Sequence, residues 1–174
     1  MKKNTCTMLY SLFIALLFIA MGCSSNNEEQ EEPSQNVMME HEDLGTEPWV
    51  VNIEELTVAN NDFRAARWTG GHLQLTVMSL KPGEEIGLES HPHNDQFLRI
   101  ETGKARVLMG QTEDSLYFDK EVSDDWSILI PAGYWHNLIN TGDTDVKIYS
   151  LYAPPEHPKG TIHHRPEDDD HHRH

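Results

Sequence analysis

Residues 131–140 read Pro-Ala-Gly-Tyr-Trp-His-Asn-Leu-Ile-Asn, and this stretch decides the fold class. A Pro-x-Gly turn opens it, an aromatic and apolar run follows, and the sequence Asn-Thr-Gly-Asp from Asn140 onward is good turn chemistry. We therefore place His136 at the start of a short strand. Asn140 is interpreted as a turn residue rather than a ligand.

The same pattern of short β-rich runs between Gly and Pro turns extends outward over residues 49–158. Strands repeated at such short intervals predict an antiparallel, all-β sandwich or barrel. The leading segment, 49–71, is expected to hold a strand or a helix, with a short helix at 52–56. The predicted strands centre on residues 73–77, 97–100, 105–109, 128–130, 138–139 and 146–151.

Candidate metal ligands gather in two clusters, residues 87–96 and 131–140. His91 and His93 lie two residues apart, so on an extended segment both side chains point to the same face. Gln96 follows on a strand-like run and offers a carbonyl oxygen, while His136 comes from the second cluster. Imidazole nitrogen combined with amide oxygen suits a divalent ion such as Zn, Fe, Mn, Ni or Cu.

These two clusters resemble the two motifs of the cupin superfamily. The first motif is Gly, five residues, His-x-His, three or four residues, Glu, six residues, Gly; here His91-x-His93, Gln96 and Gly103 follow that layout. It departs from the family because Gln replaces Glu and only two residues separate His93 from Gln96. We expect the neutral Gln to weaken metal binding, and the short spacing means that His91 and His93 need not both reach the ion.

The second motif is Gly, five residues, Pro-x-Gly, two residues, His, three residues, Asn. Pro131, Gly133, His136 and Asn140 match it, with Asp125 in place of the opening Gly. The resemblance implies a small double-stranded β-helix, or jelly-roll barrel, similar to proteins described as mannose-6-phosphate-isomerase-like. It also implies a metal site at His91, His93, Gln96 and His136, with His136 the strongest candidate and His93 the weakest.

The two ends of the chain differ from the middle. Residues 1–22 have a basic start and an apolar run before Cys23, and they resemble a bacterial lipoprotein signal peptide with lipid attached at Cys23. Residues 23–48 are expected to form a disordered acidic linker, and residues 159–174 a disordered His-rich tail. The resemblance implies a lipid-anchored protein of the bacterial cell envelope; an uncut signal anchor is the alternative.

The chain has 174 residues and a formal net charge of -16, which allows one ordinary domain and argues against nucleic-acid partners. Both of its 2 cysteines precede residue 24, so residues 24–174 offer no thiolate ligand.

Three functions stay open from the sequence. The first is a metal-dependent enzyme, an isomerase or an oxygenase, acting on a small sugar-like, carboxylic or enolic molecule. Its general base is not evident, with Glu89 and Asp95 candidates by position only. The second is a non-catalytic module that binds a small ligand or a metal. The third is a structural homodimer that pairs through an edge strand, as cupins often do.

Overall fold

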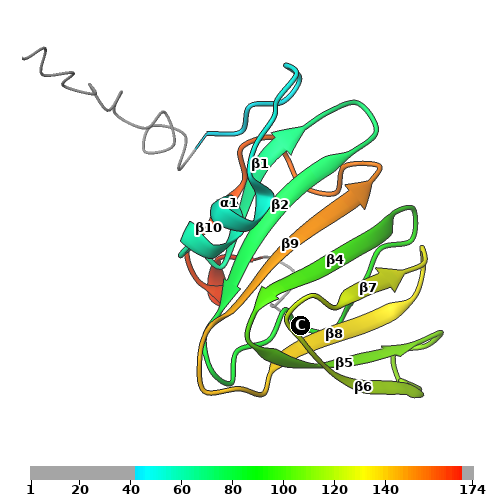
Figure 1. Cartoon of the computed structure of the whole chain (residues 1–174). Coiled ribbons are helices and arrows are strands. Elements are labelled where there is room, and N and C mark those ends of the chain that lie inside the picture. The colour runs from blue at the N-terminus through cyan, green and yellow to red at the C-terminus, as the bar shows by residue number, and fades with distance from the viewer. Residues whose placement is uncertain (1–41, 170–174) are drawn as a thin grey trace, which may run out of the picture. The chain divides into compact units, whose positions relative to one another are not determined.

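The computed structural model describes residues 42–169 as two antiparallel sheets that face each other. The six-stranded sheet has the order β10-β1-β2-β9-β4-β7, and the four-stranded sheet has the order β3-β8-β5-β6 (Figure 1). This arrangement confirms the expected all-β jelly-roll barrel. The strands of the first sheet are β1 (Arg64–Thr69), β2 (Gln74–Leu80), β4 (Asp95–Thr102), β7 (Ser127–Ile130), β9 (Val146–Ala153) and β10 (Ile162–His163).

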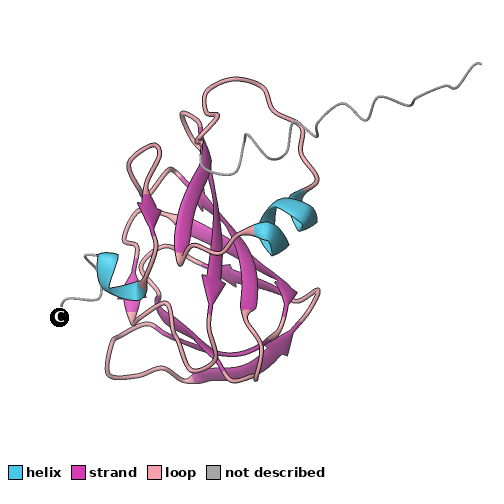
Figure 2. Ribbon diagram, turned by 90° about the vertical axis from the view of Figure 1, so that its left-hand side faces the viewer, coloured by secondary structure: helices cyan, strands magenta, loops and turns pink. Residues whose placement is uncertain are grey.

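The second sheet consists of β3 (Glu89–Ser90), β5 (Lys104–Gly110), β6 (Phe118–Ser123) and β8 (Trp135–Asn140). The helix α1 (Ile53–Ala59) begins after Asn52, whose side chain accepts a hydrogen bond from the Glu55 N–H. It lies on the outside of the strands (Figure 2), where Lys147 of β9 donates to the Asn60 carbonyl. A short 3-10 helix, η2 (Pro166–Asp168), ends the described chain, in which no helix has the length and apolar character to cross a bilayer.

The interior of the barrel is apolar at one end and polar at the other. Strand β9 shows the division, because its inward residues read Val146, Ile148, Ser150 and Tyr152, all buried. The paired positions of β2 follow the same order: Leu80, Met78, Thr76 and Gln74. Burial of the apolar half drives folding, with each fully buried Val, Leu, Ile, Phe or Met side chain contributing about 1.5–3 kcal/mol. The polar half is then available for chemistry.

The described chain is folded beyond the limits expected from the sequence at both ends. Asp43, in the expected linker, is buried and its carboxylate accepts hydrogen bonds from the N–H groups of Gly45, Thr69 and Gly160 and from the Thr69 hydroxyl, at 2.6–3.0 Å. Burial alone would raise the pKa of Asp43, but these donors outweigh it and hold the pKa below its ordinary value. Residues 42–48 therefore belong to the folded unit.

Residues 159–169 also differ from the expected disordered tail. Ile162–His163 pair with β1 as strand β10, and the buried carboxylate of Asp169 forms an ion pair with Arg64. The polar composition of residues 159–169 did not indicate this packing, because charged residues can be buried when they pair with a residue of opposite charge. The predicted signal peptide at 1–22, the lipid site at Cys23 and the linker up to residue 41 lie outside the described residues, as do residues 170–174.

We expect Asp43→Ala to lower the free energy of unfolding by roughly 2–4 kcal/mol, because it leaves several N–H groups without their acceptor. Urea denaturation of the full chain measures the change. Glu42→Ala, at the exposed neighbouring position, is the matched control and should leave the urea midpoint unchanged. Equal effects of the two substitutions would contradict the anchoring role of Asp43.

Candidate metal centre

Three buried side chains converge at the polar end of the barrel: Glu89, His91 and His136. One ligand atom from each lies within 4.8 Å of the other two. Glu89 is in β3 and pairs directly with His136 in β8, while His91 follows β3 by one residue. The imidazole centroids of His91 and His136 are 5.4 Å apart, so the predicted convergence of the two sequence clusters is present.

The spacing of these three groups fits a metal ion. The Oε1 atom of Glu89 is 3.2 Å from Nε2 of His91 and 3.4 Å from Nε2 of His136. Metal–nitrogen bonds of about 2.0–2.1 Å place neighbouring ligand atoms roughly 3–3.4 Å apart. Two imidazoles and one carboxylate also form a donor set that suits first-row transition metals.

The hydrogen bonds of His136 leave one of its nitrogens available. Its Nδ1 lies 3.0 Å from the carbonyl oxygen of Tyr134, which can only accept, so Nδ1 carries the proton. The other ring nitrogen, Nε2, faces the site. Within residues 42–169, this buried Nε2 has no hydrogen-bond partner, and neither has the Oε2 atom of Glu89. Buried polar atoms rarely stay unpaired, so this geometry favours a bound group.

Carboxylates fix the orientation of His91. Its Nδ1 lies 3.3 Å from Glu156 Oε1, and its Nε2 faces Glu89. Burial alone would lower the pKa of His91, but the two carboxylates outweigh it and raise the pKa. A metal ion that binds His91 would therefore displace a proton. The imidazole–carboxylate contact on the far nitrogen is the usual way in which proteins orient a metal-binding histidine.

A buried cation balances the charge of Glu89. Arg64 in β1 is fully buried, and its Nη2 atom is 4.0 Å from Glu89 Oε1 while Nη1 pairs with Asp169. Burial alone would raise the pKa of Glu89, but the imidazoles of His136 and His91 and the charge of Arg64 outweigh it and hold the pKa well below its ordinary value. Glu89 is thus an ionised carboxylate, the form that binds a metal.

The four predicted ligands lie in different surroundings in the structure. His91 and His136 meet, and Gln96 is buried on β4, where its Nε2 donates to Ser150 Oγ at 3.1 Å. Its Oε1 atom has no hydrogen-bond partner in the described part of the chain. Gln96 pairs with Tyr152 of β9, whose ring contacts that of His91. His93 is exposed and lies outside the group.

From the sequence, Glu89 is a candidate base only, and nothing identifies Arg64 as its counter-charge. The motif spacing could have identified Glu89 as a ligand. If the motif is counted from Glu89-x-His91, five residues separate Gly83 from Glu89 and four residues separate His91 from Gln96. The first motif then fits without the short spacing. Asp95, the other candidate base, is exposed and its carboxylate accepts from the Ala132 N–H at 3.0 Å.

His157 makes the stability of the fold depend on pH. Its ring packs edge-on against Tyr152, and burial, with the charge of Arg64, lowers its pKa to about 3. The unfolded chain binds this proton near pH 6.5 and the folded chain does not, so the stabilisation is fully present above pH 6.5 and is lost as the pH falls toward 3. We expect a slope of up to about 1.4 kcal/mol per pH unit from this residue.

Urea midpoints of the full chain between pH 7.5 and 4.5 test this expectation, with His157→Gln as the comparison. The raised pKa of His91 acts in the opposite sense, so the difference between the two chains isolates His157. Parallel loss of stability in both chains would show that His157 has no part in the pH dependence.

The chain is similar to a known domain family and to several known proteins. The Cupin domain family matches residues 76–152. A crystal structure of BH2720 from Bacillus halodurans is 57% identical, has a TM-score of 0.72, and covers 73% of this chain and 96% of that chain. The Bacillus subtilis protein YrkC is 59% identical over 121 residues, which is 70% of this chain and 65% of that protein, slightly under two thirds of its length.

A protein of Acanthamoeba polyphaga mimivirus is 44% identical over 115 residues, 66% of this chain and 70% of that protein. The family match extends over the segment that holds Glu89, His91, Gln96 and His136. The chain therefore belongs to the cupin superfamily.

Proposed function

We propose that this chain is a metal-dependent cupin in which Glu89, His91 and His136 hold one divalent transition-metal ion. The observation that supports this most directly is a pair of buried atoms that make no hydrogen bond among residues 42–169, His136 Nε2 and Glu89 Oε2, within a group whose ligand atoms lie inside 4.8 Å. Gln96 is the candidate for a further oxygen ligand, because its Oε1 is buried without a partner among residues 42–169.

The ligand of this site is a small polar molecule, sugar-like or carboxylic or enolic, and the reaction is an isomerisation or an oxygenation. When bound, the ion would act as a Lewis acid on a carbonyl or hydroxyl oxygen of that molecule. The protein supplies an ionised Glu89, an oriented His91 and a partly exposed carboxylate at Glu156, which is within reach of a proton on His91. Glu156 is the residue best placed to exchange a proton with solvent.

A non-catalytic module that binds a small ligand or a metal in the cell envelope is the alternative. Gln96 favours it, because a neutral amide stands where the family motif has a carboxylate, and the sequence shows no evident general base. Turnover of sugars, enols or carboxylic acids by the metal-loaded chain would exclude this alternative.

Elemental analysis of the full chain and of His136→Ala tests the metal site. We expect about one ion per chain beyond that of the variant, because any binding by the terminal histidines is common to both chains. His93→Ala is the matched control, since that side chain is exposed and outside the group. Equal metal contents in wild type and His136→Ala would overturn the proposal.

We also propose that the chain is anchored to the cell envelope by lipid at Cys23. The support is the basic start and the apolar run that precede Cys23 in the sequence. Cys23→Ser should move the protein from the membrane fraction to the aqueous fraction of cells. Retention of the variant in the membrane fraction would contradict lipid anchoring.

A further inference from the structure

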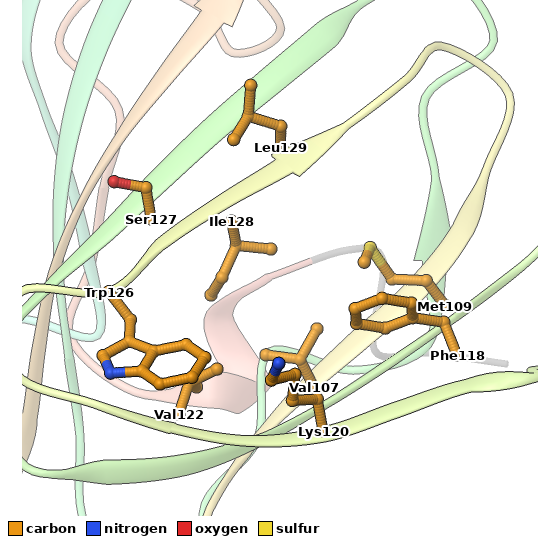
Figure 3. A pocket seen from close by; sticks show the side chains of 9 residues that line it. All are labelled: Val107, Met109, Phe118, Lys120, Val122, Trp126, Ser127, Ile128 and Leu129. Carbon is orange, nitrogen blue, oxygen red and sulfur yellow. The ribbon is translucent and has the colours of Figure 1, made fainter.

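An apolar cavity lies between one edge strand of each sheet. The edge strand of the six-stranded sheet is β7 and that of the four-stranded sheet is β6, and these two strands are not hydrogen-bonded to each other. The cavity between them, here named the β6–β7 pocket, has a volume of about 300 Å³. Its apolar wall consists of Val107, Met109, Phe118, Val122, Trp126 and Ile128 (Figure 3).

The apolar wall is more open to solvent than a core. Val107, Val122 and Ile128 belong to the buried core, but Trp126 and Phe118 are 42% and 43% exposed. Phe118 and Met109 lie at one end of the pocket and Trp126 at the other, whereas Ser127 and Leu129 of β7 point away (Figure 3). Cavities of this size, lined mostly by apolar and aromatic side chains, are typical small-molecule sites.

One cation interrupts the apolar wall. Lys120 lies on the same face of β6 as Phe118 and Val122, so its exposed side chain lines the pocket rather than the outer side of the sheet. Its Nζ lies 5.0 Å from the centroid of the Trp126 ring. Among residues 42–169, no carboxylate forms an ion pair with Lys120; Asp119 beside it pairs instead with Arg106.

We propose that the β6–β7 pocket binds a small apolar monoanion, such as a medium-chain or aromatic carboxylate. The apolar body would cover Trp126, Phe118 and the core residues behind them, and the carboxylate would meet Lys120. A chain with a net charge of -16 repels anions in general, so the inward lysine would provide the local attraction that such a ligand needs. None of the residues Glu89, His91 and His136 lines this pocket, so ligand binding there does not require a metal ion.

Titration calorimetry of the full chain with octanoate, octan-1-ol and octylamine tests the proposal, because these probes share one chain length and differ in charge. We expect octanoate to bind with one molecule per chain, about tenfold more tightly than octan-1-ol, and to change the tryptophan emission of the chain. Octylamine should not bind detectably. Equal affinities for the three probes, or no binding of octanoate, would overturn the proposal.

Substitutions at exposed positions separate the pocket from its surroundings. Lys120→Met should weaken octanoate binding about tenfold, to the level of octan-1-ol, and Phe118→Glu should abolish it through repulsion. Lys104→Met, on β5 and outside the pocket, is the matched control and should bind like wild type. An inward lysine on an edge strand can have a different role, which is to prevent strand pairing between molecules. Self-association of Lys120→Met with unchanged octanoate binding would establish that role and refute the site.

Discussion

Glu89→Gln should weaken Zn²⁺ binding by the full chain roughly 100-fold, a loss at the upper end of those seen when the supporting partners of metal ligands are removed. The substitution keeps the shape of the side chain and removes its negative charge, which the group of two imidazoles cannot replace. It also leaves Arg64 with a neutral neighbour. Competition with a fluorescent chelator at neutral pH measures the affinity.

The opposite change at Gln96 provides the complementary test. Gln96→Glu adds a carboxylate at a buried position whose amide oxygen has no partner within the described residues, so we expect tighter Zn²⁺ binding, by roughly tenfold. Both variants retain the terminal histidines, so any binding by the chain end is common to them. An unchanged affinity in Glu89→Gln would mean that the measured ion is held elsewhere.

Arg64→Met is expected to lower the free energy of unfolding by about 3–5 kcal/mol, because it leaves the buried carboxylates of Glu89 and Asp169 without their shared cation. Methionine fills much of the same volume, so the loss reports charge more than packing. Urea denaturation at pH 7 measures the change.

Arg106→Met is the matched control for Arg64. Arg106 on β5 forms an ion pair with Asp119, but both side chains are exposed. Exposed pairs contribute up to about 1 kcal/mol, so this variant should remain close to wild type in stability. Similar losses in the two variants would contradict a buried charge cluster.

Strands with an apolar face were predictable from the sequence, and strands with buried or exposed charge were not. The runs at 73–77, 105–109 and 146–151 became β2, β5 and β9 because their inward residues fill the core. Strand β1 reads RAARWT, and its two arginines conceal a buried strand. Strand β6 reads FDKEVS and lacks an apolar period, because it is an edge with charge on both faces.

The site was predictable to the extent that histidines from two sequence clusters would meet. His91 and His136 do so, since the register of β3 against β8 brings their clusters together. The participation of Glu89 was concealed by His93, which completes a His-x-His pattern at the wrong spacing. Arg64 and Asp169 could not be assigned, because their pairing depends on contacts between residues 105 positions apart.

The borders of the family match have a practical consequence for recombinant work. A fragment limited to residues 76–152 would retain Glu89, His91 and His136 but would lack Arg64, Asp43 and Asp169. In isolation that fragment would hold the ligands without the cation that balances them, and without β1 it would expose β2 as a sheet edge. Chimaeras should therefore be joined outside residues 42–169, so that the charged residues that stabilise the ligands are transferred together with them.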